Sequence, residues 1–128
     1  MDILTTLNFW LWVAAALLAA LYMMAGVMKA TQPIEKLAAQ MKWAPGLPRL
    51  TRFVGVVEIL GAIGLILPLA TGILAWLTPL AALGLTIIQV LAIGLHLRRG
   101  EPEVLPFNAV LLALSLFVLW GRWSLFGI

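Results

Sequence analysis

The sequence predicts an all-α integral membrane protein, a single transmembrane domain (residues 1–128) built as a four-helix bundle. Two observations carry this prediction. First, 64% of the 128 residues are hydrophobic and only 10% are charged, whereas a soluble domain is about half apolar and about a quarter charged. Second, the apolar residues form four runs separated by prolines, glycines and basic residues. A soluble domain of this size could not bury so much apolar surface, but a bilayer accepts it.

Each run approaches the roughly 20 residues that cross a bilayer. We expect spans at about residues 7–28, 50–69, 78–97 and 105–120. Lys29 closes the first span, and Pro68 lies near the end of the second. The pair Thr78-Pro79 predicts the start of the third, with Thr78 as a hydroxyl N-cap and the proline in the first helical position.

The segment between the first two spans predicts a short amphipathic helix in the membrane interface, at about residues 33–42. Apolar residues recur at the spacing of one helix face, at Ile34, Leu37, Ala38 and Met41. Glu35 and Lys36 fall on the other face, and a Pro-Gly turn follows.

The distribution of basic residues predicts the orientation. Four spans place both chain ends on one side of the membrane. Every basic residue except Arg122 lies on the other side, at Lys29, Lys36, Lys42, Arg49, Arg52, Arg98 and Arg99. The positive-inside rule therefore puts the basic loops in the cytoplasm and both termini outside. Because these charges are few and separate apolar runs, they do not indicate nucleic-acid binding.

Polar residues inside a span are costly and are therefore candidate functional groups. They gather in the cytoplasmic half of the predicted bundle, at Tyr22, Lys29, Glu58, Gln89, His96 and Asn108. Glu58 shares its helix face with Gly55 and Gly61, which predicts that it points into the bundle. It is expected either to pair with Lys29 or His96 and fix the packing, or to bind a ligand or exchange a proton.

The other candidates also have structural interpretations. Lys29 either reaches the lipid head groups or pairs with Glu58. His96 either lies in the head-group zone or faces inward with Gln89, and the two amides, Gln89 and Asn108, either bond neighbouring helices or face a ligand. One histidine and no cysteine provide no set of metal ligands, so we expect no metal site and no intrinsic cofactor. No catalytic residue is assigned.

Several short stretches occur in an order that resembles a known family. They cover residues 25–29, 33–37, 52–62, 77–82 and 96–101, with Asn108 beyond. Together they resemble the DoxX-like family of small bacterial membrane proteins over nearly the whole chain. The resemblance implies a four-helix fold in the bacterial cytoplasmic (inner) membrane. It also implies recurring polar positions, which would be Lys29, Glu58, His96 and Asn108. Some relatives are linked to thiosulfate:quinone oxidoreduction or to oxidative-stress complexes, which makes a quinone one expected ligand.

Two classes of function stay open. The first is a non-catalytic binding protein or accessory subunit of a quinone-linked redox system, holding a quinone, another lipid-like molecule, a membrane protein partner or a second copy of the chain. The alternative is a membrane-embedded enzyme or small transporter for an apolar substrate, with Glu58 and His96 as its acid–base pair. A cavity beside Glu58 favours a ligand, whereas a solid core favours a scaffold.

Overall fold

The computed structural model describes residues 3–38 and 44–127, and four long helices make up most of this part of the chain. They are α1 (Ile3–Thr31), α3 (Pro48–Thr71), α4 (Leu77–Arg98) and α5 (Leu105–Arg122). Each belongs to a segment long and apolar enough to cross a membrane. The described residues contain no strand. The predicted all-α membrane bundle is confirmed, and the chain is a multi-pass membrane protein.

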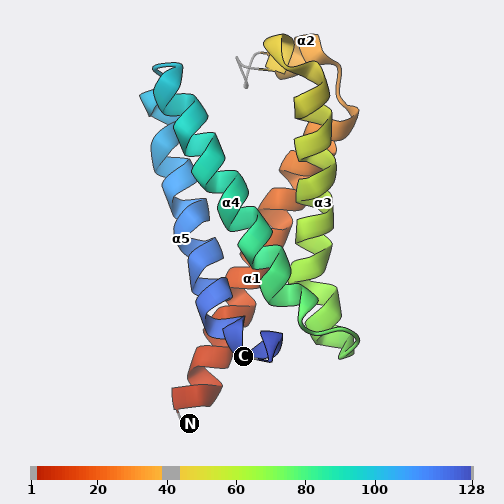
Figure 1. Cartoon of the computed structure of the whole chain (residues 1–128), viewed down its shortest axis with the longest axis vertical. Coiled ribbons are helices and arrows are strands. Elements are labelled where there is room, and N and C mark those ends of the chain that lie inside the picture. The colour runs from red at the N-terminus through yellow and green to blue at the C-terminus, as the bar shows by residue number, and fades with distance from the viewer. Residues whose placement is uncertain (1–2, 39–43, 128) are drawn as a thin grey trace.

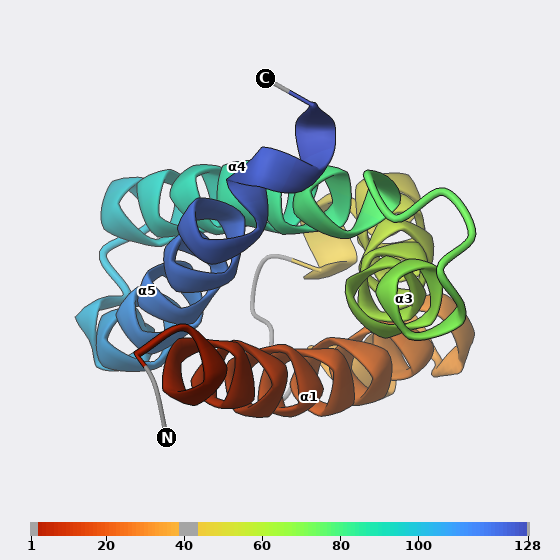
Figure 2. The same cartoon turned by 90° about the horizontal axis from the view of Figure 1, so that it is seen from below.

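The helices surround a common centre as two tilted pairs. Viewed from the end that carries the termini, α1 and α4 lie on opposite sides, with α3 and α5 between them (Figure 2). From the side, α3 and α4 meet at the turn that joins them and diverge toward the end that carries α2 (Ile34–Leu37) (Figure 1). The end that carries α2, together with Arg98 and Arg99 at the end of α4, is called the basic end of the bundle, and it is the wider one.

Two helices differ from the predictions, one in its length and one in where it begins. The expected interfacial helix is one short turn, α2, within the described residues, and its predicted continuation over residues 39–42 lies outside them. The third span begins one residue before the predicted cap, at Leu77. Thr78 does not cap it, because its hydroxyl donates across to the Gly64 carbonyl of α3 at 3.0 Å. This bond ties α4 to α3 just after their turn.

Glycines allow α1 and α3 to pack with their backbones in contact. A Cβ atom on Gly26 would lie 2.7 Å from the Gly55 carbonyl oxygen, and one on Gly55 would lie 2.7 Å from the Ala30 nitrogen. Such approaches are closer than real Cβ contacts. Small residues at this crossing permit the tight contact that stabilises helix pairs in lipid, and it places Lys29, one turn beyond Gly26, against α3.

At the opposite end, α1 packs on α5. Leu11 fills the space that a side chain at Gly121 would need. Arg122 donates to Asn8 Oδ1 at 2.8 Å and stacks over the Trp12 ring, 5.6 Å from its centroid. The one basic residue on the side of the termini is thus held by α1.

Apolar side chains cover the outside of the bundle. Leu60, Leu91 and Val110, from three different helices, are 62%, 67% and 55% exposed. An exposed apolar surface of this extent is unfavourable in water and is solvated by lipid in a bilayer.

Candidate functional site

A cavity of about 450 Å³ opens in the wide half of the bundle, and all four long helices line it. Its polar lining residues are Tyr22, Lys29, Glu58, Gln89, His96 and Asn108. These are the six candidates named from the sequence. The structure therefore brings together side chains that are far apart in sequence, with 86 positions separating Tyr22 from Asn108. The remaining lining is apolar.

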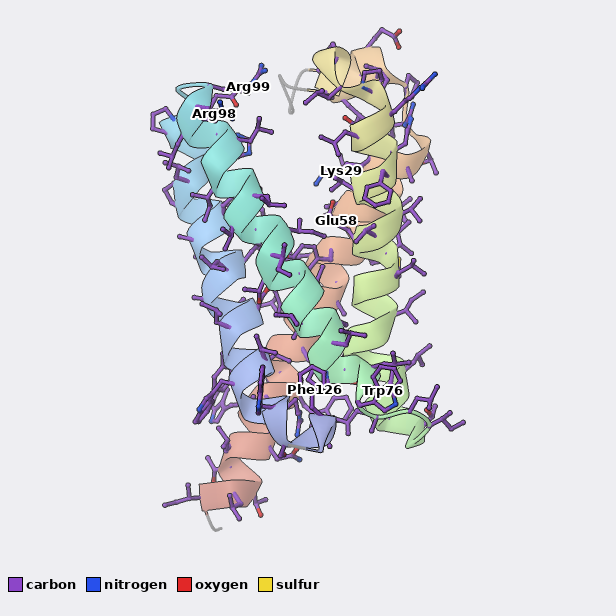
Figure 3. The ribbon with its side chains drawn as sticks, viewed as in Figure 1. Lys29, Glu58, Trp76, Arg98, Arg99 and Phe126 are labelled. Atoms are coloured by element: carbon purple, nitrogen blue, oxygen red, sulfur yellow. The ribbon has the colours of Figure 1, made fainter. Side chains whose placement is uncertain are left out.

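Glu58 pairs with Lys29. The Lys29 ammonium donates to Glu58 Oε1 at 2.6 Å, and the two side chains are 14% and 3% exposed. Figure 3 shows them pointing toward one another from α1 and α3. Of the two partners expected for Glu58, the structure selects Lys29. A buried carboxylate needs such a partner, because desolvation of an isolated charge is very unfavourable.

Arg52 positions this ion pair. Its guanidinium donates to the carbonyl oxygens of Lys29, at 3.0 Å, and Gln32, at 2.5 Å. These are carbonyls at the C-terminal end of α1, where unpaired acceptors and the negative end of the helix dipole attract a cation. Arg52 lies two turns before Glu58 on α3, so one helix holds the end of α1 and also pairs with its lysine.

His96 has its own acidic partner. Its Nδ1 donates to Glu101 Oε1 at 3.0 Å, and Arg99 Nε lies 3.3 Å from the same oxygen. The hydrogen bond from His96, with the charge of Arg99, holds the pKa of the Glu101 carboxyl below its usual value. The Glu101 backbone nitrogen also donates to the His96 carbonyl at 2.9 Å. This small network lies at the C-terminal end of α4, where His96 lines the cavity and where Figure 3 labels Arg98 and Arg99.

Sequence reasoning did not assign Glu101 a role in the site. The sequence feature that could have pointed to Glu101 is the glycine directly after the helix. Gly100 has a φ of 68°, a backbone conformation that favours glycine and turns the chain. That turn brings residue 101 back toward residue 96. Ser115, fully buried beside Tyr22, was missed because a serine donating to its own helix, here to the Leu111 carbonyl at 2.8 Å, leaves no pattern in sequence.

Tyr22, Gln89 and Asn108 are buried, and each has one polar side-chain atom that is left unpaired within the described part of the chain. Their exposures are 1%, 4% and 8%. The Tyr22 hydroxyl, Gln89 Oε1 and Asn108 Nδ2 are inaccessible, and among the described residues they have no hydrogen-bond partner. The hydroxyl does lie beside Ser115 and Gln89, but without the geometry of a hydrogen bond. One polar atom of each amide, Gln89 Oε1 and Asn108 Nδ2, thus takes no part in the interhelical bonds that the structural interpretation predicts.

The cavity is not closed. Three of its apolar lining residues are exposed, namely Leu50 on α3, Leu91 on α4 and Phe107 on α5. They mark places where the lining reaches the outer surface of the bundle. A molecule in the cavity could thus keep its polar end beside the buried amides and its apolar end among these side chains, as ligand sites with few polar groups do.

A second hollow differs in chemistry. A groove of about 690 Å³ lies between α3 and α4 nearer their turn, lined by residues such as Leu60, Gly64, Leu67 and Leu80. The described residues that line it include no ionisable side chain. Among the described residues, no group of three or more histidine, cysteine, aspartate or glutamate side chains is placed to hold a metal ion. The 450 Å³ cavity is therefore the candidate site.

Comparison with known proteins identifies one matching protein family. The model of the DoxX-like family matches residues 13–118 of the chain, a stretch that includes all six polar lining residues. No curated protein and no solved structure matches the chain.

Proposed function

The chain belongs to the DoxX-like family, and we propose that it is a non-catalytic binding protein that holds a lipid-like small molecule in the cavity between its four helices. The observation that carries this proposal is the group of unpaired polar atoms on Tyr22, Gln89 and Asn108. Leaving a buried donor or acceptor unpaired destabilises a protein by about 1–3 kcal/mol. A ligand head group bonded to these atoms would remove that cost.

A quinone is a suitable ligand class for such a cavity. A quinone has an oxygen-bearing ring and a long apolar tail. The cavity likewise has a few polar groups and an otherwise apolar lining, which includes the exposed residues Leu50, Leu91 and Phe107. We propose that the protein serves as an accessory subunit of a quinone-linked redox system in the bacterial inner membrane. Electrons would come from a membrane protein partner, which could contact the exposed apolar faces of the helices.

The alternative, an enzyme or transporter with Glu58 and His96 as its acid–base pair, has less support. Each of these side chains already has a close partner of its own, Lys29 for Glu58 and Glu101 for His96. An acid–base pair must be free to bond a substrate and to exchange a proton with it. Both groups are instead engaged in contacts that fix the ends of α1 and α4.

We further propose that the basic end of the bundle faces the cytoplasm and that both termini lie outside. Arg98 and Arg99 lie at that end, whereas Trp76 and Phe126 lie at the opposite end, where aromatic residues favour the interface (Figure 3). A fluorescent reporter that matures only in the cytoplasm should stay dark when fused to either terminus and fluoresce when inserted after Gly100. Bright signal from both terminal fusions would reverse the orientation.

The binding proposal is tested by replacing one unpaired amide. Gln89→Leu should lower the amount of small molecule that co-purifies in mild detergent by about 2- to 10-fold, the effect of one hydrogen bond, as measured by mass spectrometry of an organic extract. After the small molecule has been removed from both proteins, the variant should be at least as stable as wild type, because it lacks the unpaired buried Gln89 Oε1.

The matched control is Thr86→Val, one turn earlier on α4. Thr86 is also buried, but its hydroxyl donates to the Ala82 carbonyl at 2.7 Å and it does not line the cavity. It should retain the co-purified molecule. Wild-type protein that carries no small molecule, together with a Gln89→Leu variant that is less stable, would make the polar lining structural and contradict the proposal.

A further inference from the structure

We propose that the head group of the ligand is neutral and carries a hydroxyl, so that the cavity prefers an alcohol, phenol or quinol to the corresponding ether or carbonyl compound. This inference rests on the proposed binding function. It follows from how the polar groups of the cavity are paired, and which of them are not.

The charged groups of the cavity are neutralised within the protein. Lys29 and Glu58 satisfy one another at 2.6 Å, and His96 and Arg99 share the carboxylate of Glu101. An anionic head group would compete with Glu58 for Lys29, and a cationic one would compete with Lys29 for Glu58. Since separating a buried ion pair is strongly unfavourable, a neutral head group fits this lining best.

The groups that stay unpaired can both donate and accept. Tyr22, on α1, has a hydroxyl, and Gln89 and Asn108, on α4 and α5, have primary amides. A phenol has one donor and can accept, and each amide has a carbonyl oxygen and an NH2 group. Turning a terminal amide by half a revolution exchanges its oxygen and nitrogen, so either atom can face a ligand.

Such a set discriminates between head groups. A head group that only accepts, such as a ketone or an ether, can bond Asn108 Nδ2 or the Tyr22 hydroxyl but leaves Gln89 Oε1 without a donor. A hydroxyl can donate to Gln89 Oε1 and accept from Asn108 Nδ2 or from Tyr22. Sites that contain buried hydrogen-bonding groups reject analogues without the matching group much more strongly than apolar pockets reject a missing methylene. Of a quinone and its quinol, the quinol should therefore bind more tightly.

The test uses a pair of probes that differ only at this group, para-octylphenol and its methyl ether. The full chain is placed in lipid nanodiscs, and each probe is titrated at matched concentrations within the membrane, so that partitioning does not bias the comparison. Binding is measured as the rise in melting temperature followed by tryptophan fluorescence. The phenol should bind about 10-fold more tightly than the ether.

The variants separate the outcomes. The preference for the phenol should disappear in Gln89→Leu and persist in Thr86→Val. If the phenol and the ether stabilise wild type equally, the hydroxyl inference is wrong while the cavity remains a ligand site. If neither probe stabilises the wild-type protein, the binding function itself is contradicted.

Discussion

Replacing Lys29 by methionine should be the most damaging change to the site. It leaves the Glu58 carboxylate, whose side chain is 3% exposed, without its partner. Removing one member of a buried ion pair costs about 3–5 kcal/mol, because the remaining charge is desolvated and uncompensated. The free energy of unfolding, measured by titration with sodium dodecyl sulfate in mixed micelles, should fall by that amount.

The reverse change should cost less. In Glu58→Gln the charge that remains is Lys29, which is more exposed and lies in the last turn of α1. Its long side chain can extend to the head groups, which limits the loss to about 1–2 kcal/mol. The double variant Lys29→Met/Glu58→Leu should recover most of the stability, since apolar replacement of a buried pair is often neutral. A double variant that is no more stable than Lys29→Met alone would show that the two side chains are not coupled.

Adding one methyl group at Gly55 should have the second-largest effect. In Gly55→Ala the new Cβ would lie 2.7 Å from the Ala30 nitrogen and 2.8 Å from the Gly26 carbonyl oxygen. Both are backbone atoms and cannot move without separating α1 from α3. Overpacking of this kind costs about 1–3 kcal/mol. It should also lengthen the contact between Lys29 and Glu58, which lie on either side of the same crossing.

Gly94→Ala is the matched control, because a Cβ at Gly94 of α4 would meet no atom of the described residues within 4 Å. This variant should be as stable as wild type or slightly more so, since alanine favours a helix by about 1 kcal/mol over glycine. The two variants are compared by the same detergent titration. Similar stability of Gly55→Ala and Gly94→Ala would contradict the close crossing of α1 and α3.

The sequence predicts the helices and the polar cluster because both depend on local rules. A run of about 20 apolar residues crosses a bilayer whatever its neighbours are. A polar group such as Glu58, Gln89 or Asn108 avoids lipid, so it turns inward in almost any packing of the four helices. The expectation that six polar side chains share one level of the bundle follows from these two rules, and the structure places all six on one cavity.

The partners of these side chains depend on helix rotation and tilt, which the sequence does not specify. Glu58 could face either Lys29 or His96 until the glycine contact between α1 and α3 is known. Arg52 was expected only to mark the cytoplasmic side, but it also holds the end of α1 through the Lys29 carbonyl. His96 is oriented by Glu101, which only the turn at Gly100 brings within reach.

The cavity itself results from the divergence of α3 and α4 toward the basic end (Figure 1). No composition rule predicts this spread. Thr78 and Gly64 hold the two helices together near their turn, whereas the residues that face the cavity at the other end include the two unpaired amides. The structure thus contains both features that the sequence analysis gave as alternatives. One is the ion pair of Glu58, which fixes the packing, and the other is a cavity at the same level.

The most direct test of this account is an experimental structure of the chain in lipid nanodiscs, prepared from native membranes without added ligand. The account predicts elongated non-protein density in the cavity, with its polar end within hydrogen-bonding distance of Tyr22, Gln89 and Asn108 and its other end near Leu91 or Phe107. A cavity filled by the protein's own side chains, with Tyr22 bonded to Gln89 and Asn108 bonded to another helix, would contradict it.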